Sequence, residues 1–173
     1  NYFLHALGTG VNKFIKIDPS ANYIWTVDLD TNMHPTDVIE LNNQIIIGLY
    51  SSGSGSDIRS YDLNGNLLWK TSYSGKYSDI YFTLHSSGDI IASYKNQKYG
   101  GASLLRIDSS GNILWEKTYE DLPQSEFEDI TNNAVVESSD GNLIVLSLNK
   151  HTKEPGEGGV YKVDINDGTK LLP

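Results

Sequence analysis

The chain contains no cysteine, a single methionine and no long apolar run. Without cysteine it has no disulfide, no thiolate-ligated zinc, no iron–sulfur cluster and no thiol nucleophile. No stretch approaches the about 18 apolar residues that a membrane-spanning helix requires. No basic segment followed by an apolar one precedes the first strand pattern, so we expect a signal peptide to be absent or already removed.

Positive charge is also scarce. Thirteen Lys and Arg face 22 Asp and Glu, which gives a formal net charge of −9. Such a surface repels phosphate backbones and anionic lipids, so we expect neither nucleic-acid binding nor membrane insertion. With 173 residues, 38% of them hydrophobic and 20% charged, the chain has the size and balance of one globular domain.

What the chain has instead is a repeat. An Asp followed by Asn four residues later and by Trp seven residues later occurs three times, and the three Asp residues are 44 and 46 positions apart. A weaker fourth copy begins 56 positions further on. We assign a structural role to the frame residues Asp18, Trp25, Asp62, Trp69, Asp108, Trp115 and Asp164.

Each copy has the pattern of a hairpin, in which a run of alternating apolar residues ends at Asp, turns, and resumes as a run that ends at Trp. A second hairpin precedes it, so each period holds four short strands. Four-stranded units that repeat every 40–50 residues indicate a β-propeller. The sequence therefore predicts an all-β fold of antiparallel, four-stranded blades, about four in number, over residues 1–28, 37–73, 79–119 and 129–173. We expect the Trp residues to pack between blades.

The blade count is incomplete. Residues 1–7 align with a second strand, since Asn1-Tyr2 matches Asn43-Gln44, so the first blade lacks its innermost strand. Residues 170–173 leave only a truncated last strand. Three interpretations follow: a piece of a larger propeller, a compact four-bladed ring, or a homo-oligomer that forms through the open blade edges.

The best-matching copy also carries a family resemblance. The stretch from Asp79 to Tyr119, with Asp108, Gly111-Asn112 and Trp115, resembles the repeats of bacterial and archaeal secreted β-propellers, loosely grouped with the PQQ-like and delta-sixty repeats. Asp62, Gly65-Asn66 and Trp69 match equally well, whereas Ala21 replaces Gly in the first copy and Leu171 replaces Trp in the last. The resemblance implies a prokaryotic extracellular or cell-surface protein. Family members range from adhesion or scaffold modules to quinoprotein dehydrogenases, outer-membrane assembly factors and aryl sulfotransferases.

The two sets of connections differ in length. One set consists of tight turns. The other set is longer, and long loops on a rigid scaffold are the usual place for binding. We expect this long-loop face to bind a glycan or a protein partner through Tyr73, Tyr77, Tyr99 and Tyr119, since aromatic rings suit such contacts. The alternative is that these tyrosines only cover the loops.

Three further aspartates, Asp37, Asp79 and Asp129, each precede the first strand of a blade. Together they could bind a hard cation such as calcium. Alternatively, each carboxylate accepts backbone N–H groups at the start of a strand. No other cofactor is predicted, and the four scattered His residues have no zinc-ligand spacing.

No catalytic signature is present in the sequence: there is no Gly-x-Ser-x-Gly elbow and no P-loop. We therefore expect a non-enzymatic binding or adhesion module. One alternative is a structural subunit that assembles by completing a neighbour's blade. Another is a fragment of a larger propeller enzyme of the quinoprotein or sulfotransferase type.

Overall fold

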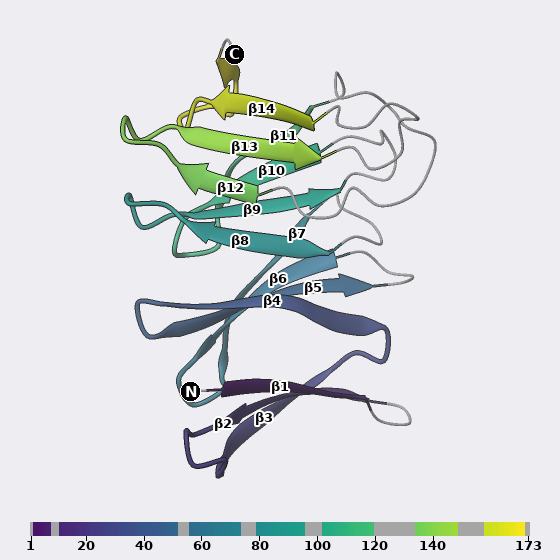
Figure 1. Ribbon diagram of the computed structural model, residues 1–173. Helices are drawn as coiled ribbons and strands as arrows, with labels where there is room; N and C mark the ends of the chain where they lie inside the picture. Colours follow the sequence, from purple (N-terminus) through teal and green to yellow (C-terminus); the bar gives the residue numbers. More distant parts are fainter. Residues whose placement is uncertain are drawn as a thin grey trace. The chain divides into compact units, whose positions relative to one another are not determined.

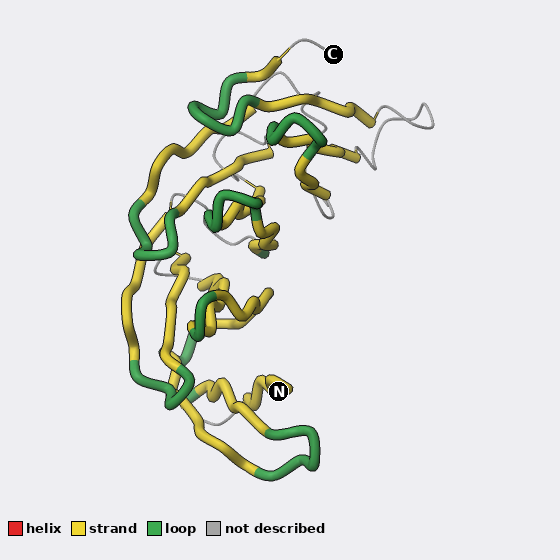
Figure 2. The backbone as a smooth tube through the Cα atoms, turned by 90° about the vertical axis from the view of Figure 1, so that its left-hand side faces the viewer, coloured by secondary structure: helices red, strands yellow, loops and turns green. Residues whose placement is uncertain are grey.

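The computed structural model describes residues 2–7, 11–51, 56–73, 79–95, 102–119, 134–148 and 158–171. These residues form antiparallel strands joined by turns, and none of them is helical (Figures 1 and 2). The prediction of an all-β fold is therefore confirmed. The chain divides into two compact units, Asn1–Asp79 and Ile80–Pro173, and each unit contains two sheets.

The first unit contains sheets A and B. Sheet A has three strands in chain order, β1 (Tyr2–Leu7), β2 (Asn12–Ile17) and β3 (Tyr23–Leu29). Sheet B has four: β4 (Met33–Leu41), β5 (Gln44–Ser51), β6 (Ser56–Asp62) and β7 (Leu67–Tyr73). Each strand pairs with the next one in the chain, as the sequence predicted for successive hairpins.

The second unit contains sheets C and D, with the same chain-order pairing. Sheet C consists of β8 (Ile80–Leu84), β9 (Ile90–Lys95), β10 (Ala102–Ile107) and β11 (Ile113–Tyr119). Sheet D consists of β12 (Ala134–Glu137), β13 (Leu143–Leu148), β14 (Gly158–Val163) and β15 (Lys170–Leu171). The three-stranded sheet A and the two-residue strand β15 agree with the predicted strand count.

The Asp–Asn frame determines the turns. In sheet A, Asp18 Oδ1 accepts hydrogen bonds from the backbone N–H groups of Ser20, at 2.8 Å, and Asn22, at 2.9 Å. The Asn22 side chain donates to the second carboxylate oxygen at 2.9 Å. The pKa of Asp18 is lowered by these bonds from Asn22 and Ser20, because they stabilise the ionised carboxylate. The frame is thus a turn device rather than a ligand site.

The same bonds recur at the other copies of the frame. Asp62 accepts from the backbone of Asn64 and Asn66, and Asp108 accepts from the backbone of Ser110 and Asn112, all at 2.8–2.9 Å. In the weaker copy, Asp164 accepts from the backbone N–H of Asn166 at 2.7 Å. The structural role assigned to the four aspartates agrees with these contacts.

Strand β4 begins earlier than the sequence suggested. Residues 30–36 were expected to form a loop and Asp37 to precede the strand, but β4 starts at Met33 and Asp37 lies inside it. A register shift between Pro35 and Asp37 allows the strand to continue past the proline. A bulge of this kind accommodates the missing N–H of proline within a ladder.

The alignment of β1 also requires a correction. Tyr2 pairs with Ile17, the residue before Asp18, and Ile45 pairs with Tyr61, the residue before Asp62. Tyr2 therefore corresponds to Ile45, and not to Gln44 as the match of Asn1-Tyr2 with Asn43-Gln44 implied. A shift of one residue exchanges the two faces of a strand, so the correction changes which β1 side chains point toward sheet B.

Each unit has one apolar core between its two sheets. In the first unit the core joins Phe14, Trp25 and Leu29 of sheet A to residues of sheet B such as Ile45 and Ile47. In the second unit it joins Leu104 and Trp115 of sheet C to Leu143, Val145 and Val163 of sheet D. Trp25 and Trp115 both belong to these cores, each with residues of the two sheets of its unit.

Candidate functional site

The two buried tryptophans are fixed by the same contact in both units. Trp25 Nε1 donates to the carbonyl of Leu63 at 2.8 Å, and Trp115 Nε1 donates to the carbonyl of Ile165 at 2.7 Å. Each acceptor is the residue that follows the frame aspartate of the next sheet. The indole therefore packs its ring in the core while its N–H binds the next sheet's turn, which is how buried tryptophans satisfy their polar atom. These rings have no surface left for stacking a cofactor.

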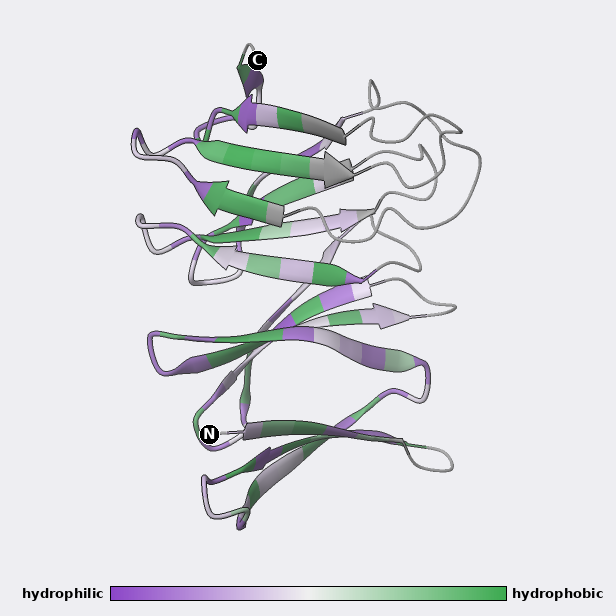
Figure 3. Ribbon diagram, viewed as in Figure 1, coloured by the Kyte–Doolittle hydropathy of each residue, from purple (hydrophilic) through white to green (hydrophobic). Residues whose placement is uncertain are grey.

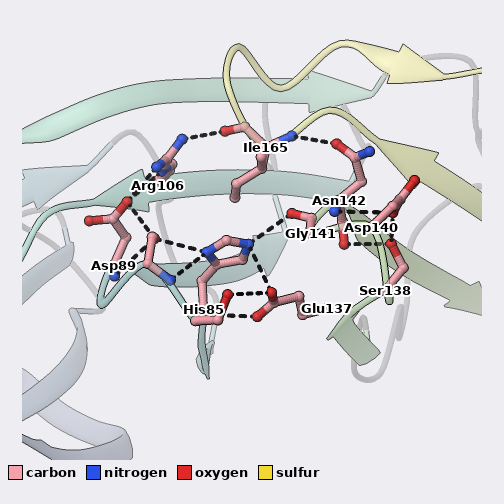
Figure 4. A network of polar contacts seen from close by, with 11 residues as sticks. His85, Asp89, Arg106, Glu137, Ser138, Asp140, Gly141, Asn142 and Ile165 are labelled. Carbon is pink, nitrogen blue, oxygen red and sulfur yellow. Dashed lines mark hydrogen bonds and ion pairs between the residues drawn. The ribbon is translucent and has the colours of Figure 1, made fainter.

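A polar network in the second unit joins three turns (Figure 4). It connects turn 85–89 of sheet C with turns 138–142 and 164–169 of sheet D. His85 lies at its centre and is 9% exposed. The Nε2 atom of His85 lies 2.8 Å from the carbonyl of Gly141 and 3.5 Å from Glu137 Oε1.

The contacts of His85 define its tautomer. A carbonyl oxygen only accepts, so Nε2 carries the proton that is donated to Gly141. The other nitrogen, Nδ1, then accepts from the backbone N–H of Ser87 at 3.1 Å. Ser87 Oγ is 2.8 Å from Nδ1 and donates to Asp89 Oδ2 at 2.9 Å. The imidazole thus links two turns through both nitrogens.

Charged groups complete this network on either side. Arg106 binds Asp89 Oδ2 through Nε at 2.8 Å and through Nη2 at 2.5 Å, and its Nη1 donates to the carbonyl of Ile165 at 2.6 Å. Glu137 accepts from both the backbone N–H and the hydroxyl of Ser86, at 2.7 and 2.5 Å. These two bonds from Ser86 lower the pKa of Glu137.

The combination of Ser87, His85 and Glu137 resembles a nucleophile, base and acid only in composition. The hydroxyl of Ser87 donates to Asp89, and the lone pair of His85 Nδ1 is occupied by a backbone N–H. A general base needs that lone pair free for the proton of its nucleophile. The geometry of this network therefore supports fixing sheet C to sheet D rather than catalysis.

The first unit has a charged cluster of its own. Asp57, whose side chain is 5% exposed, accepts from Lys70 at 2.9 Å, Arg59 at 3.0 Å and Ser72 at 2.9 Å. Burial raises the pKa of Asp57, but its donors outweigh this effect and hold it below the ordinary value. Arg59 also reaches Asp30, in the connection between β3 and β4, at 3.1 Å. The carboxylate is saturated with donors and so is not arranged as a metal ligand.

The tyrosines predicted to bind a ligand are distributed as follows. Tyr73 ends β7 and is 7% exposed, and its burial raises the pKa of its phenol. Tyr119 ends β11, and its hydroxyl donates to the carbonyl of Gly168 at 2.9 Å. Tyr73 is therefore buried within the fold, whereas Tyr119 is partly buried and its hydroxyl is bound to sheet D. Tyr77 and Tyr99 lie outside the described residues.

The predicted calcium ligands do not come together among the described residues. Asp37 lies in β4. Its Oδ1 accepts from the backbone N–H of Val38 at 2.8 Å, so this carboxylate binds a backbone group. Asp79 is exposed and directly precedes β8, and Asp129 lies outside the described residues. Over the ranges that the structure describes, no group of three His, Asp or Glu side chains is placed to hold a metal ion. Calcium binding stays a prediction.

Sequence reasoning missed the network around His85. Its members come from three turns and from strands β10 and β12, and His85 and Gly141 are 56 positions apart in the chain. No spacing signal in the sequence connects His85 to Glu137 or Arg106. Only the packing of sheet C on sheet D brings these residues together.

Comparison with known proteins supports the fold alone. No family model matches the chain, and no curated protein matches it. The chain is similar to a crystal structure, at 1.35 Å resolution, of a protein of unknown function from Bacteroides caccae, with a TM-score of 0.56 and 15% identity. The match covers 98% of this chain and 56% of the Bacteroides chain, so this chain spans little more than half of that protein's length.

One further finding concerns membranes. Within the described ranges, the chain has no helix with the length and hydrophobicity to cross a bilayer.

Proposed function

We propose that this chain is a β-propeller-type binding module of a bacterial or archaeal cell surface, and that it recognises its partner through the connections opposite the tight turns. The propeller arrangement and the surface location rest on the repeat and its family resemblance. The antiparallel sheets, each built from successive hairpins, support the fold part of the proposal.

One observation supports the choice of face. At the end that carries the Asp–Asn frames, the turns are short and their polar groups bind one another, as around His85 and Asp18. At the other end, connections span residues 74–79, 96–101 and 120–133 between strands. Long connections on a rigid scaffold are the usual site of recognition.

The chemistry of the partner follows from aromatic rings and charge. Tyr73 and Tyr119 end strands and contact the fold, which leaves Tyr77 and Tyr99 as the candidates among the four tyrosines. Tyrosine supplies a large, rigid contact with a polar tip at low entropic cost. A net charge of −9 disfavours acidic partners. We therefore propose uncharged sugar rings as the first ligand class to test.

The test uses immobilised neutral oligosaccharides and a variant with Tyr77→Ala and Tyr99→Ala. We expect the double variant to lose at least about tenfold in affinity, which is about 1.4 kcal/mol. The matched control is Tyr23→Ala, because Tyr23 is 65% exposed but follows the tight turn of sheet A. Equal affinity of the double variant and the wild type would refute the proposed face.

A second candidate role is that of a structural subunit, and the strand count of sheet A favours it. Strand β1 pairs only with β2 among the described residues, whereas the corresponding strands β5, β9 and β13 each have a neighbour on both sides. An open edge of this kind accepts an added strand. No observation in the described residues favours the third alternative, a fragment of a propeller enzyme.

A further inference from the structure

Both internal sheet–sheet contacts follow one rule of register. We call the face of a sheet that contacts the next sheet in its unit the leading face, and the face that contacts the preceding sheet the trailing face. In the first unit, Phe14 on the leading face of sheet A packs with Ile45 and Ile47 on the trailing face of sheet B. In the second unit, Leu104 packs with Leu143 and Val145 in the same way.

The trailing face of sheet A carries the same apolar positions, and no other sheet of the described residues in its unit covers it. By strand register, Tyr2 corresponds to Ile45 and Leu143, and Leu4 corresponds to Ile47 and Val145. Tyr2 is 59% exposed and Leu4 is 49% exposed, whereas their four counterparts are 0–3% exposed. These positions are buried wherever a neighbouring sheet is present in the same unit.

The leading face of sheet D also exposes apolar residues at positions that are buried in the other sheets. Val160 stands four residues before its frame aspartate, as do Phe14 and Leu104. Val160 is 60% exposed, compared with 3% for Phe14 and 0% for Leu104. Val136 of strand β12 lies on the same face of sheet D and is 56% exposed. Figure 3 shows the apolar run along the adjacent strand β13.

We propose that these two faces bind each other between copies of this chain: the leading face of sheet D in one copy packs on the trailing face of sheet A in the next. The occupant follows from the two internal contacts, in which a leading face always meets a trailing face. A second copy supplies the matching face without any further component. The contact is independent of glycan recognition and requires no strand addition at β1.

The charges on the two faces allow such a contact. Lys13 and Asp28 of sheet A form an ion pair at 2.6 Å, and Lys162 and Asp140 of sheet D form one at 2.5 Å. Each charge thus has an opposite charge on its own sheet, so closing the contact leaves no ion of these pairs without a partner. A buried charge that loses its partner is strongly destabilising, and a contact that keeps both pairs intact avoids that cost.

The contact is heterologous, because the two surfaces that meet are different. Heterologous contacts generate rings or open chains rather than closed two-fold dimers. We therefore expect the molar mass of the 173-residue chain, from size-exclusion chromatography with light scattering, to rise with concentration above the 19.2 kDa of one copy. A mass of one copy at every concentration would overturn the proposal. The two faces would then be expected to contact further repeats of a longer protein.

Single variants test each face. Leu4→Asp and Val160→Asp each place a charge in the proposed contact and should raise its dissociation constant at least about tenfold. The matched control is Leu114→Asp, since Leu114 is 48% exposed but belongs to the edge strand β11 of sheet C. The melting temperature of each variant at low concentration shows whether the single copy still folds. Loss of association in the control to the same extent would contradict the assignment of the faces.

Mixing the two variants tests the heterologous geometry. Leu4→Asp retains an intact sheet D face, and Val160→Asp retains an intact sheet A face. Each variant alone should remain a single copy, whereas an equimolar mixture should form a one-to-one complex and no larger species. A mixture that stays at the mass of one copy would refute head-to-tail packing.

Discussion

At the scale of single residues, the turns depend on a few positions with positive φ. Gly168, with φ +72, places its Cα against the indole of Trp115. A Cβ at this position would lie 2.9 Å from Trp115 Cε3 and 2.7 Å from Lys117 Cγ. Glycine at Gly168 therefore serves both the turn and the close packing of sheet C on sheet D.

Gly168→Ala should destabilise the protein by more than backbone strain alone. The matched control is Gly141→Ala, because Gly141 has φ +78 and nothing within 4 Å of the added Cβ. We expect the control to lose about 1 kcal/mol and Gly168→Ala about 1–3 kcal/mol more, since overpacking adds to the strain. Urea unfolding measures both values. Equal losses would show that the indole moves aside without cost.

Ala21 holds the turn of sheet A at φ 64, at the position where Gly65 and Gly111 stand in the next two copies. An L-residue in this region costs roughly 1–2 kcal/mol. Ala21→Gly should therefore raise the free energy of unfolding by about 0.5–1 kcal/mol, in spite of the larger entropy of the unfolded chain. Gly111→Ala, at φ 87, should change stability in the opposite direction. A loss of stability in Ala21→Gly would contradict this account.

At the scale of elements, two turns of the second unit are joined by the ionised side chain of Glu137. Its pKa is lowered by its bonds to Ser86, so it is lower in the folded protein than the ordinary value of 4.5 in the unfolded chain. Such a group stabilises the fold above pH 4.5, and the contribution is lost as the pH falls through the folded pKa.

Glu137→Gln should therefore flatten the acid side of the stability curve. Between about pH 5 and pH 3 the melting temperature of the wild type should fall more steeply than that of the variant. Ser86→Ala removes one of the two donors and should produce part of the same change. Parallel melting curves for the wild type and Glu137→Gln would show that the bonds of Glu137 to Ser86 do not stabilise the fold.

The elements also show what the sequence could and could not predict. The hairpins and turns around Asp18, Asp62 and Asp108 were predictable, because side chain, turn and strand pattern all lie within a few residues. The start of β4 was not, because Pro35 and Asp37 suggested a loop and only pairing with β5 reveals the bulge. The register of β1 was missed because the alignment relied on the match of Asn1-Tyr2 with Asn43-Gln44. The pairing of Tyr2 with Ile17, next to Asp18, cannot be read from that match.

The candidate site was less predictable than the fold. The network around His85 depends on two sheets meeting, and no local pattern encodes that contact. The sequence placed Tyr73 and Tyr119 in the long connections, yet each is the last residue of a strand; Tyr73 is buried and the Tyr119 hydroxyl binds Gly168. Exposure at the last residue of a strand depends on neighbouring elements, which a single sequence does not specify.

At the scale of the whole molecule, net charge opposes the proposed association of copies. Each copy carries −9, so two copies repel each other at low salt. The Debye length falls from about 30 Å at 0.01 M to about 10 Å at 0.1 M salt. We expect the dissociation constant, measured by light scattering, to decrease as salt is raised over this range. Weaker association at higher salt would indicate that ion pairs, rather than apolar faces, hold the copies together.

The proline in β4 has a consequence for the behaviour of the protein at high concentration. This nine-residue strand forms an edge of sheet B, and a long, flat edge is the usual template for amyloid-like aggregation. The register shift beside Pro35 interrupts the straight ladder that an incoming strand would need. Sheet B is thereby protected along its longest edge against uncontrolled fibril growth, while ordered contacts elsewhere on the molecule are left possible.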